Sequence, residues 1–139
     1  MTKPAIRFIR WHFINILIVV AFVWACATLP PIQPIRDLNS IAGKWEGTWH
    51  GPLGADPFSI TIKKDGTWES IVPADSNLAR KFGTRFVGTV NLSEGKCRFK
   101  SQTTGMTGIY TLHEGGGRRV LVIVSDDGKS RAELEPAKN

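Results

Sequence analysis

Cysteine is scarce in this sequence of 139 residues, where only Cys26 and Cys97 occur. Two cysteines are too few for the disulfide framework of a small secreted domain. Long stretches of helix-forming residues are also missing, and the 14 glycines and 8 prolines argue against a helical bundle. The formal charge of +6 includes no concentrated basic patch, so we expect no nucleic-acid partner.

Residue types that carry catalysis or bind metal are also few. His50 and His113 show no paired His/Cys spacing of the kind that holds zinc, and Cys97 has no evident histidine partner. Asp126 and Asp127 precede a glycine between two apolar runs, which indicates a hairpin turn rather than paired catalytic carboxylates. We therefore predict no enzymatic activity, no metal and no cofactor.

The first part of the chain resembles an export signal. Lys3, Arg7 and Arg10 precede a strongly apolar run at residues 13–29. This order is typical of a signal peptide, although the run is also close to the roughly 20 residues that span a bilayer. Because basic residues stay on the cytoplasmic side, we expect the remainder of the chain to be exported.

Three ways of processing this segment remain open. Residues 23–26, Val-Trp-Ala-Cys, resemble the bacterial lipobox, which implies removal of residues 1–25 and lipidation of Cys26. Residues 25–27 match an A-x-A site with cleavage after Ala27, and the third alternative is an uncleaved anchor. The prolines that follow favour the lipobox, because they predict an extended tether over residues 26–39. By resemblance to Gram-negative lipoproteins, Ala27 implies the outer membrane, facing the periplasm.

Beyond the tether, short runs of alternating apolar and polar residues are separated by turn residues. Such alternation predicts β-strands, and residues 73–82 predict one or two helical turns. We expect eight strands, at residues 43–51, 58–63, 67–72, 84–92, 97–101, 106–113, 120–124 and 130–134.

Hairpin connections between these strands predict an all-β fold. We expect an antiparallel up-and-down meander that closes into a small barrel, because an open sheet would leave two exposed edges. A two-sheet sandwich is the alternative. The predicted organisation is a signal peptide at 1–25, a Pro-rich tether at 26–39, a barrel at 40–136 and a tail at 137–139.

Gly43-Lys44-Trp45 at the start of the first strand resembles the Gly-x-Trp signature of lipocalins and related calycin barrels. The resemblance implies that Trp45 packs at the closed end of a barrel, with an arginine near the last strand lying across it. Arg131 is placed to be that arginine, and Trp49 shares the face of Trp45.

Two hypotheses of function follow. The first is a membrane-anchored lipocalin-like lipoprotein that binds a small apolar or amphipathic envelope ligand at the barrel mouth. Glycines on inward positions, Gly47, Gly88 and Gly108, would leave room for it. The predicted ligand-binding residues are Trp68, Phe82, Phe86 and Tyr110, with Phe82 as a lid residue.

The second hypothesis is an envelope interaction or scaffold protein with a filled barrel. Bulky residues on inward positions favour it, namely Trp45, Trp49, Phe58, Phe86 and Phe99. A basic stripe formed by Lys96, Arg98 and Lys100 indicates either edge-protecting surface charge or attraction to an anionic envelope polymer. Further basic residues expected near the stripe are Arg80, Lys81, Arg85, Arg118 and Arg119.

Overall fold

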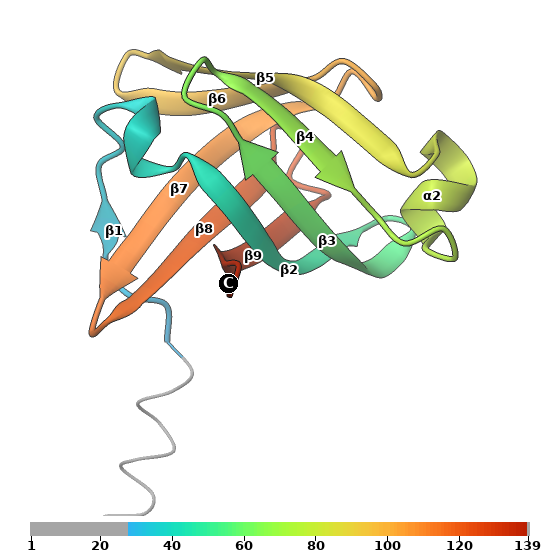
Figure 1. Ribbon diagram of the computed structural model, residues 1–139, viewed down its shortest axis with the longest axis horizontal. Helices are drawn as coiled ribbons and strands as arrows, with labels where there is room; N and C mark the ends of the chain where they lie inside the picture. The colour runs from blue at the N-terminus through green and yellow to red at the C-terminus, as the bar shows by residue number, and fades with distance from the viewer. Residues whose placement is uncertain (1–27, 139) are drawn as a thin grey trace, which may run out of the picture.

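The computed structural model describes residues 28–138, which form a closed β-barrel with one additional strand outside it (Figure 1). The eight barrel strands are antiparallel and follow one another in chain order, and the last pairs with the first. The predicted all-β meander and its closure are therefore confirmed. The strands are β2 (Gly43–Gly51), β3 (Gly54–Ile62), β4 (Thr67–Ile71), β5 (Arg85–Ser93), β6 (Lys96–Ser101), β7 (Thr107–Gly115), β8 (Arg118–Ser125) and β9 (Arg131–Pro136).

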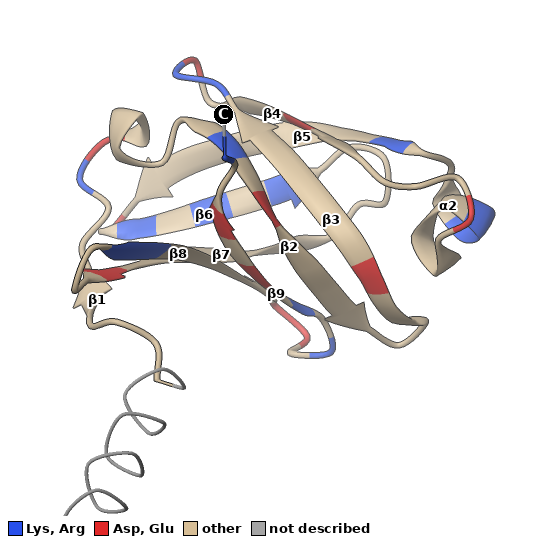
Figure 2. Ribbon diagram, turned by 60° about the horizontal axis from the view of Figure 1, so that its bottom comes forward, with Lys and Arg blue, Asp and Glu red and all other residues tan. Residues whose placement is uncertain are grey.

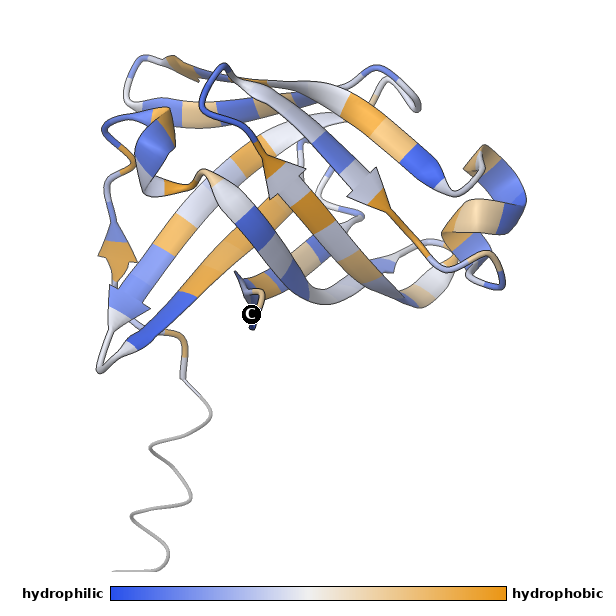
Figure 3. Cartoon of the chain, in the orientation of Figure 1, coloured by the Kyte–Doolittle hydropathy of each residue, from blue (hydrophilic) through white to orange (hydrophobic). Residues whose placement is uncertain are grey.

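Hydrophilic and hydrophobic residues alternate along several strands (Figure 3), and this alternation decides which face of each strand enters the core. Trp45 and Trp49 on β2 are buried, with 2% and 7% of their surface exposed, whereas Lys44 between the glycine and the tryptophan faces solvent. The predicted inward positions of both tryptophans are thus confirmed. On β8, residues 120–123 are buried on both faces, as the continuous apolar run indicates.

Strand β3 begins earlier than the sequence predicts. Residues 54–57 continue the hairpin with β2, and Gly51 pairs with Gly54. Pro57 is tolerated inside this strand because β4 pairs only with residues 59–62, so the missing N–H interrupts no ladder on that side.

The predicted tether does not run free as far as residue 39. Ile32–Gln33 forms strand β1, which pairs with β7 through Ile32 opposite His113 and Gln33 opposite Leu112. The pairing of β6 with β7 ends at Tyr110, and β1 covers the edge of β7 beyond that point. A short 3₁₀ helix, η1 (Leu38–Ser40), then leads into β2. Part of the predicted tether thus covers an edge of β7 that would otherwise be unpaired.

The two ends of the barrel differ. We call the end covered by η1, together with the β3–β4, β5–β6 and β7–β8 hairpins, the closed end (Figure 1). The opposite end, the mouth, is bordered by the β2–β3 hairpin, the short helix α2 (Asn77–Phe82) and the loops at 102–106 and 126–130. No helix within residues 28–138 is long and apolar enough to cross a membrane.

Candidate functional site

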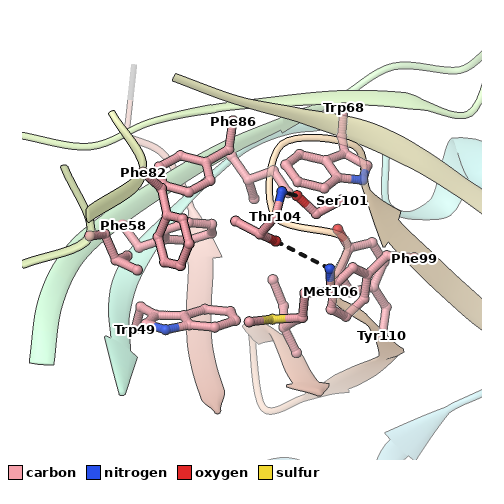
Figure 4. Close-up of a pocket in the computed structure, with 13 residues that line it drawn as sticks. Trp49, Phe58, Trp68, Phe82, Phe86, Phe99, Ser101, Thr104, Met106 and Tyr110 are labelled. Carbon is pink, nitrogen blue, oxygen red and sulfur yellow. Dashed lines mark hydrogen bonds between the residues drawn. The ribbon is translucent and has the colours of Figure 1, made fainter. Parts of the chain in front are cut away.

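An apolar cavity of about 50 Å³ lies inside the barrel toward its mouth (Figure 4). The four predicted ligand-binding residues, Trp68, Phe82, Phe86 and Tyr110, all line it. The structure thus brings together residues from β4, α2, β5 and β7, while ligand binding itself stays a prediction. The other lining residues are Trp49, Phe58, Ile60, Leu78, Phe99, Ser101, Thr104, Met106 and Ile123.

Aromatic contacts shape the wall of this cavity. The rings of Phe82 and Phe86 meet edge to face with centroids 6.3 Å apart, which joins α2 to β5. The rings of Phe99 and Tyr110 stack with centroids 5.2 Å apart across the β6–β7 pair. Such pairs add stabilisation beyond that of the buried area alone, so they hold the wall in a defined shape.

Gly88 and Gly108, two of the three glycines on predicted inward positions, do not leave open space, contrary to the prediction. The third, Gly47, is exposed. Trp68 lies over its cross-strand partner Gly88, where a Cβ atom would come within 2.5 Å of the indole. Phe99 covers Gly108 in the same way, at 2.4 Å. At Gly47 a Cβ atom would lie 2.1 Å from the carbonyl oxygen of Glu133. Rings and backbone therefore occupy the volume that the missing side chains vacate.

The polar groups of the wall are few. Ser101 Oγ accepts a hydrogen bond from the Thr104 N–H, and Thr104 Oγ1 accepts one from the Met106 N–H, each at 3.2 Å (Figure 4). These bonds fold the 102–106 loop over the barrel. The rest of the cavity surface is almost entirely apolar.

Tyr110 is the exception among the lining residues. Only 3% of its surface is exposed, yet its hydroxyl forms no hydrogen bond with any residue from 28 to 138. Every side-chain oxygen in that range that is fully enclosed by protein atoms has a hydrogen-bond partner. The Tyr110 hydroxyl has none, so it is not fully enclosed. Burial, with a smaller contribution from Cys97, raises the pKa of Tyr110 well above its ordinary value. The phenol is therefore neutral and able to donate a hydrogen bond.

A second cavity, of about 150 Å³, lies at the mouth itself. It shares Trp49, Leu78, Phe82 and Met106 with the inner cavity, so these four side chains separate the two spaces. Phe82 is 37% exposed and lines both the inner cavity and the mouth cavity, which is the position expected of a lid residue. Of the two cavities, only this one is lined by charged residues, Asp56, Lys81 and Asp127, and Ser130 also lines it.

Helix α2 is held over the mouth by a buried carboxylate that the sequence analysis does not identify. Asp56 Oδ1 accepts hydrogen bonds from the Asn77 N–H at 2.9 Å and from Asn77 Nδ2 at 3.2 Å. Its Oδ2 accepts one from the Leu78 N–H at 3.0 Å, and Ser76 caps the helix through the Ala79 N–H. Asp56 thereby satisfies donors of the first helical turn. The sequence signal for this role is an acidic residue at an inward position of β3.

At the closed end, Arg119 occupies the place predicted for Arg131. The guanidinium of Arg119 lies 5.5 Å from the centre of the Trp45 ring and donates to the carbonyl oxygen of Ser40 at 2.7 Å. Arg131 instead points outward and pairs with Glu133 at 2.8 Å. The prediction for Arg131 is wrong because the inward positions of β9 are Ala132 and Leu134.

The predicted basic stripe is interrupted by ion pairs (Figure 2). Arg98 pairs with Asp126 at 2.7 Å, Arg118 pairs with Glu135 at 2.8 Å, and Arg85 pairs with Glu69. Lys96 and Lys100 remain exposed on β6, whereas Arg80 and Lys81 lie on α2 at the mouth. The eight basic residues do not gather into one surface.

The other candidates for chemistry in the sequence are Cys97, His50 and His113. Cys97 is buried, and this burial raises the pKa of its thiol to about 11. His50 is exposed, and His113 Nδ1 lies 2.8 Å from the carbonyl oxygen of Pro30. Among residues 28–138, no three His, Cys, Asp or Glu side chains lie close enough to hold a metal ion. Cys26 lies outside the described residues.

No family model, curated protein or solved structure matches this chain. The architecture itself, an antiparallel eight-stranded closed barrel, is compatible with a lipocalin-like fold. Gly43 opens the first barrel strand, and Trp45 lies at the closed end beneath an arginine, as the resemblance implies.

Proposed function

We propose that this protein is an exported, lipid-anchored barrel of the bacterial cell envelope that binds a small apolar or amphipathic ligand at its mouth. The observation that carries the proposal is the aromatic cavity inside the barrel, which side chains such as Phe82 and Leu78 separate from a second cavity at the mouth. Binding sites for small molecules are typically concave and apolar with a few convergent polar groups.

The size and lining of the two spaces define the ligand class. The inner cavity of about 50 Å³ accommodates only the end of an apolar chain. The mouth cavity of about 150 Å³ accommodates the next part of the ligand, next to Lys81. Tyr110, which lines the inner cavity, carries a neutral phenol. A short amphipathic molecule with its apolar end inward fits this arrangement.

The envelope location rests on the sequence of the first thirty residues. A basic start, an apolar run and Ala25-Cys26 support export and lipidation of Cys26, with the outer membrane as the destination. Membrane attachment is then through the lipid on Cys26. An anionic envelope polymer is a less supported partner, because Arg98 in the basic stripe, and Arg85 and Arg118 outside it, are already paired with carboxylates.

Fluorescence titration of the delipidated protein tests ligand binding. In a Trp45→Phe/Trp49→Phe background, Trp68 on the cavity wall is the one tryptophan after residue 24. Fatty acids of increasing chain length and lysophospholipids should quench its emission saturably at micromolar concentration. No response from either lipid class would contradict ligand binding.

A cavity-filling variant provides the matched control. Leu78→Phe enlarges a side chain that lines both cavities, and should weaken binding by about tenfold, which corresponds to about 1.4 kcal/mol. Ile71→Phe makes a similar enlargement on an outward position that is 59% exposed, and should leave affinity unchanged. Equal effects of the two variants would place the ligand elsewhere.

Mass spectrometry of the membrane fraction tests the anchor. We expect a mature chain that lacks residues 1–25 and carries acyl groups on Cys26. A mature chain that begins at Thr28 would indicate cleavage at the A-x-A site, and a full-length chain would indicate an uncleaved anchor.

A scaffold protein with a filled barrel is the second candidate. The covering of Gly88 by Trp68 and of Gly108 by Phe99 favours it, because both rings fill volume that a larger ligand would need. In that case the outer face or the loops would contact a protein or polymer. The same titration separates the candidates, since a filled barrel gives no saturable response.

A further inference from the structure

The chain is fixed to the closed end of the barrel from Pro30 onward. His113 Nδ1 lies 2.8 Å from the carbonyl oxygen of Pro30, and the Glu114 N–H donates to that of Pro31 at 3.0 Å. Pro31 also packs over Gly115, where a Cβ atom would come within 3.1 Å of it. The polypeptide therefore leaves the barrel beside the β7–β8 hairpin, at the end opposite to α2 (Figure 1).

This attachment leaves only a short connection to the proposed lipid. Between Cys26 and Pro30 the chain can span at most about 14 Å, because an extended residue covers roughly 3.3–3.6 Å. A lipid on Cys26 thus holds the β7–β8 hairpin within that distance of the bilayer surface. We infer that the closed end faces the membrane and that the mouth opens away from it, an inference that rests on the proposed anchor.

The length of the barrel separates the mouth from this surface. A nine-residue strand such as β2 spans roughly 30 Å, and a tilt of about 40° reduces the distance along the barrel axis to roughly 23 Å. The mouth therefore lies beyond the reach of lipids that remain in the anchoring bilayer.

The chemistry of the closed end fits a surface of anionic headgroups. Lys63, Lys64 and Lys96 are exposed in its hairpins, and within residues 28–138 none of the three lies within 4.0 Å of a carboxylate oxygen. Basic residues next to a membrane each add favourable interaction with anionic lipid. Asp65 and Glu94 lie in the same hairpins, so this attraction supplements the short connection and does not replace it.

The orientation has a consequence for the proposed ligand. A mouth directed away from the anchoring bilayer receives its ligand from the aqueous phase or from a carrier. Extraction of a lipid from the same bilayer would require the opposite orientation.

Fluorophores at the two ends of the lipidated protein in vesicles test the orientation. Ser93→Cys labels the closed end and Ala74→Cys labels the mouth, and both positions are exposed small residues. Cys97 resists labelling at neutral pH because it is buried and its pKa is about 11. Phospholipids with a nitroxide on the headgroup should abolish most of the emission at residue 93 and little of that at residue 74. Equal quenching, or the reverse order, would overturn the inference.

A longer connection provides the control. Ten Gly/Ser residues inserted between Thr28 and Leu29 leave β1 intact but add flexible chain with a typical reach of about 5–6 Å times the square root of its length. Quenching at residue 93 should then fall toward that at residue 74. Unchanged quenching would show that the short connection does not set the orientation.

Flotation with the vesicles distinguishes failure of the inferred orientation from failure of the proposed lipid anchor. A protein that stays in solution and begins at Thr28 would overturn both the anchor and the orientation. A protein that floats but is quenched equally at its two ends would overturn the orientation alone.

Discussion

Trp45 joins three separate segments at the closed end. Its Nε1 donates to the carbonyl oxygen of Ile41 at 2.8 Å, its ring lies beneath Arg119, and Arg119 in turn binds Ser40. The side chain is thus held by a hydrogen bond, a cation–π contact and burial together.

Truncation of Trp45 should therefore be costly. We expect Trp45→Ala to lower the free energy of unfolding by about 3–5 kcal/mol, as for other buried large aromatic residues. Lys44→Ala removes only an exposed ion pair with Glu46 and should change it by less than about 0.5 kcal/mol. Urea unfolding of both variants measures the difference, and similar losses would refute the side-chain directions of β2.

The two arginines offer a direct comparison. Arg119→Ala removes the contact with Trp45 and the hydrogen bond to Ser40, and should destabilise the protein by about 1–2 kcal/mol. Arg131→Ala loses an exposed pair with Glu133, and its effect should stay within about 0.5 kcal/mol. Thermal unfolding in which Arg131→Ala has the larger effect would contradict this assignment.

The raised pKa of the Cys97 thiol predicts a change in the free energy of unfolding at alkaline pH. Burial raises the pKa of its thiol from 9.0 to about 11, so the unfolded chain loses this proton before the folded protein does. Stability from the thiol is fully present below pH 9 and is lost as the pH rises toward 11. The difference in unfolding free energy between the wild type and Cys97→Ala should be constant below pH 9 and change above it. A constant difference throughout would contradict the burial of the thiol.

At the scale of elements, α2 is the part of the mouth with the fewest connections. It lies in the only long connection between neighbouring barrel strands, and Asp56 binds its first turn. Gly83, with a φ of 87°, ends the helix in a conformation that favours glycine. The segment is thus attached mainly by one carboxylate and by the side chains of Leu78 and Phe82.

Loss of the Asp56 carboxylate should loosen α2 selectively. We expect Asp56→Ala to cost about 1–3 kcal/mol, because donors of the first turn lose their acceptor. Hydrogen exchange should accelerate at Asn77 and Leu78, while the amides of β8 stay protected in a protein that remains folded. Asp75→Ala, at an exposed position of the same segment, is the control. Equal exchange in both variants would argue against this role of Asp56.

The sequence predicts the strands well because alternation and turn chemistry are local. The burial of Trp45 and the hairpin turn between the strands predicted at 58–63 and 67–72 both follow from neighbouring residues. Strand β1 is not predictable in this way, since its partner on β7 lies some eighty residues further along the chain. The exchange of Arg131 for Arg119 has a different origin. Ala132 and Leu134 are the inward residues of β9, and Arg131 pairs with His50 at the mouth end of β2, whereas Trp45 pairs with Pro136 at the closed end.

The candidate site shows the same division. Trp68, Phe86 and Tyr110 are all predicted ligand-binding residues, and the structure places all three on one cavity. Parity does not show that Trp68 lies over Gly88, because that contact depends on the pairing of β4 with β5. Asp56 is missed because its partners are the N–H groups of another element.

At the scale of the whole molecule, the barrel separates a tightly packed end from a more open one. The closed end contains fully buried residues such as Ile41, Leu121 and Leu134, with polar bonds around Trp45. Both cavities near α2 lie at the other end. Variants at one end should therefore leave the structure of the other end largely unchanged.

The pairing of β2 with β9 has a consequence for the folding kinetics. Every other pair of neighbouring strands in the barrel is consecutive in the chain, so hairpins can form early at low entropic cost. The β2–β9 pair brings Trp45 opposite Pro136 and can form only after most of the chain is ordered. We expect this pair to be absent from the transition state. Pro136→Gly, in the part of β9 that pairs with β2 and not with β8, should then accelerate unfolding with little effect on the refolding rate, in contrast to substitutions within the β7–β8 hairpin.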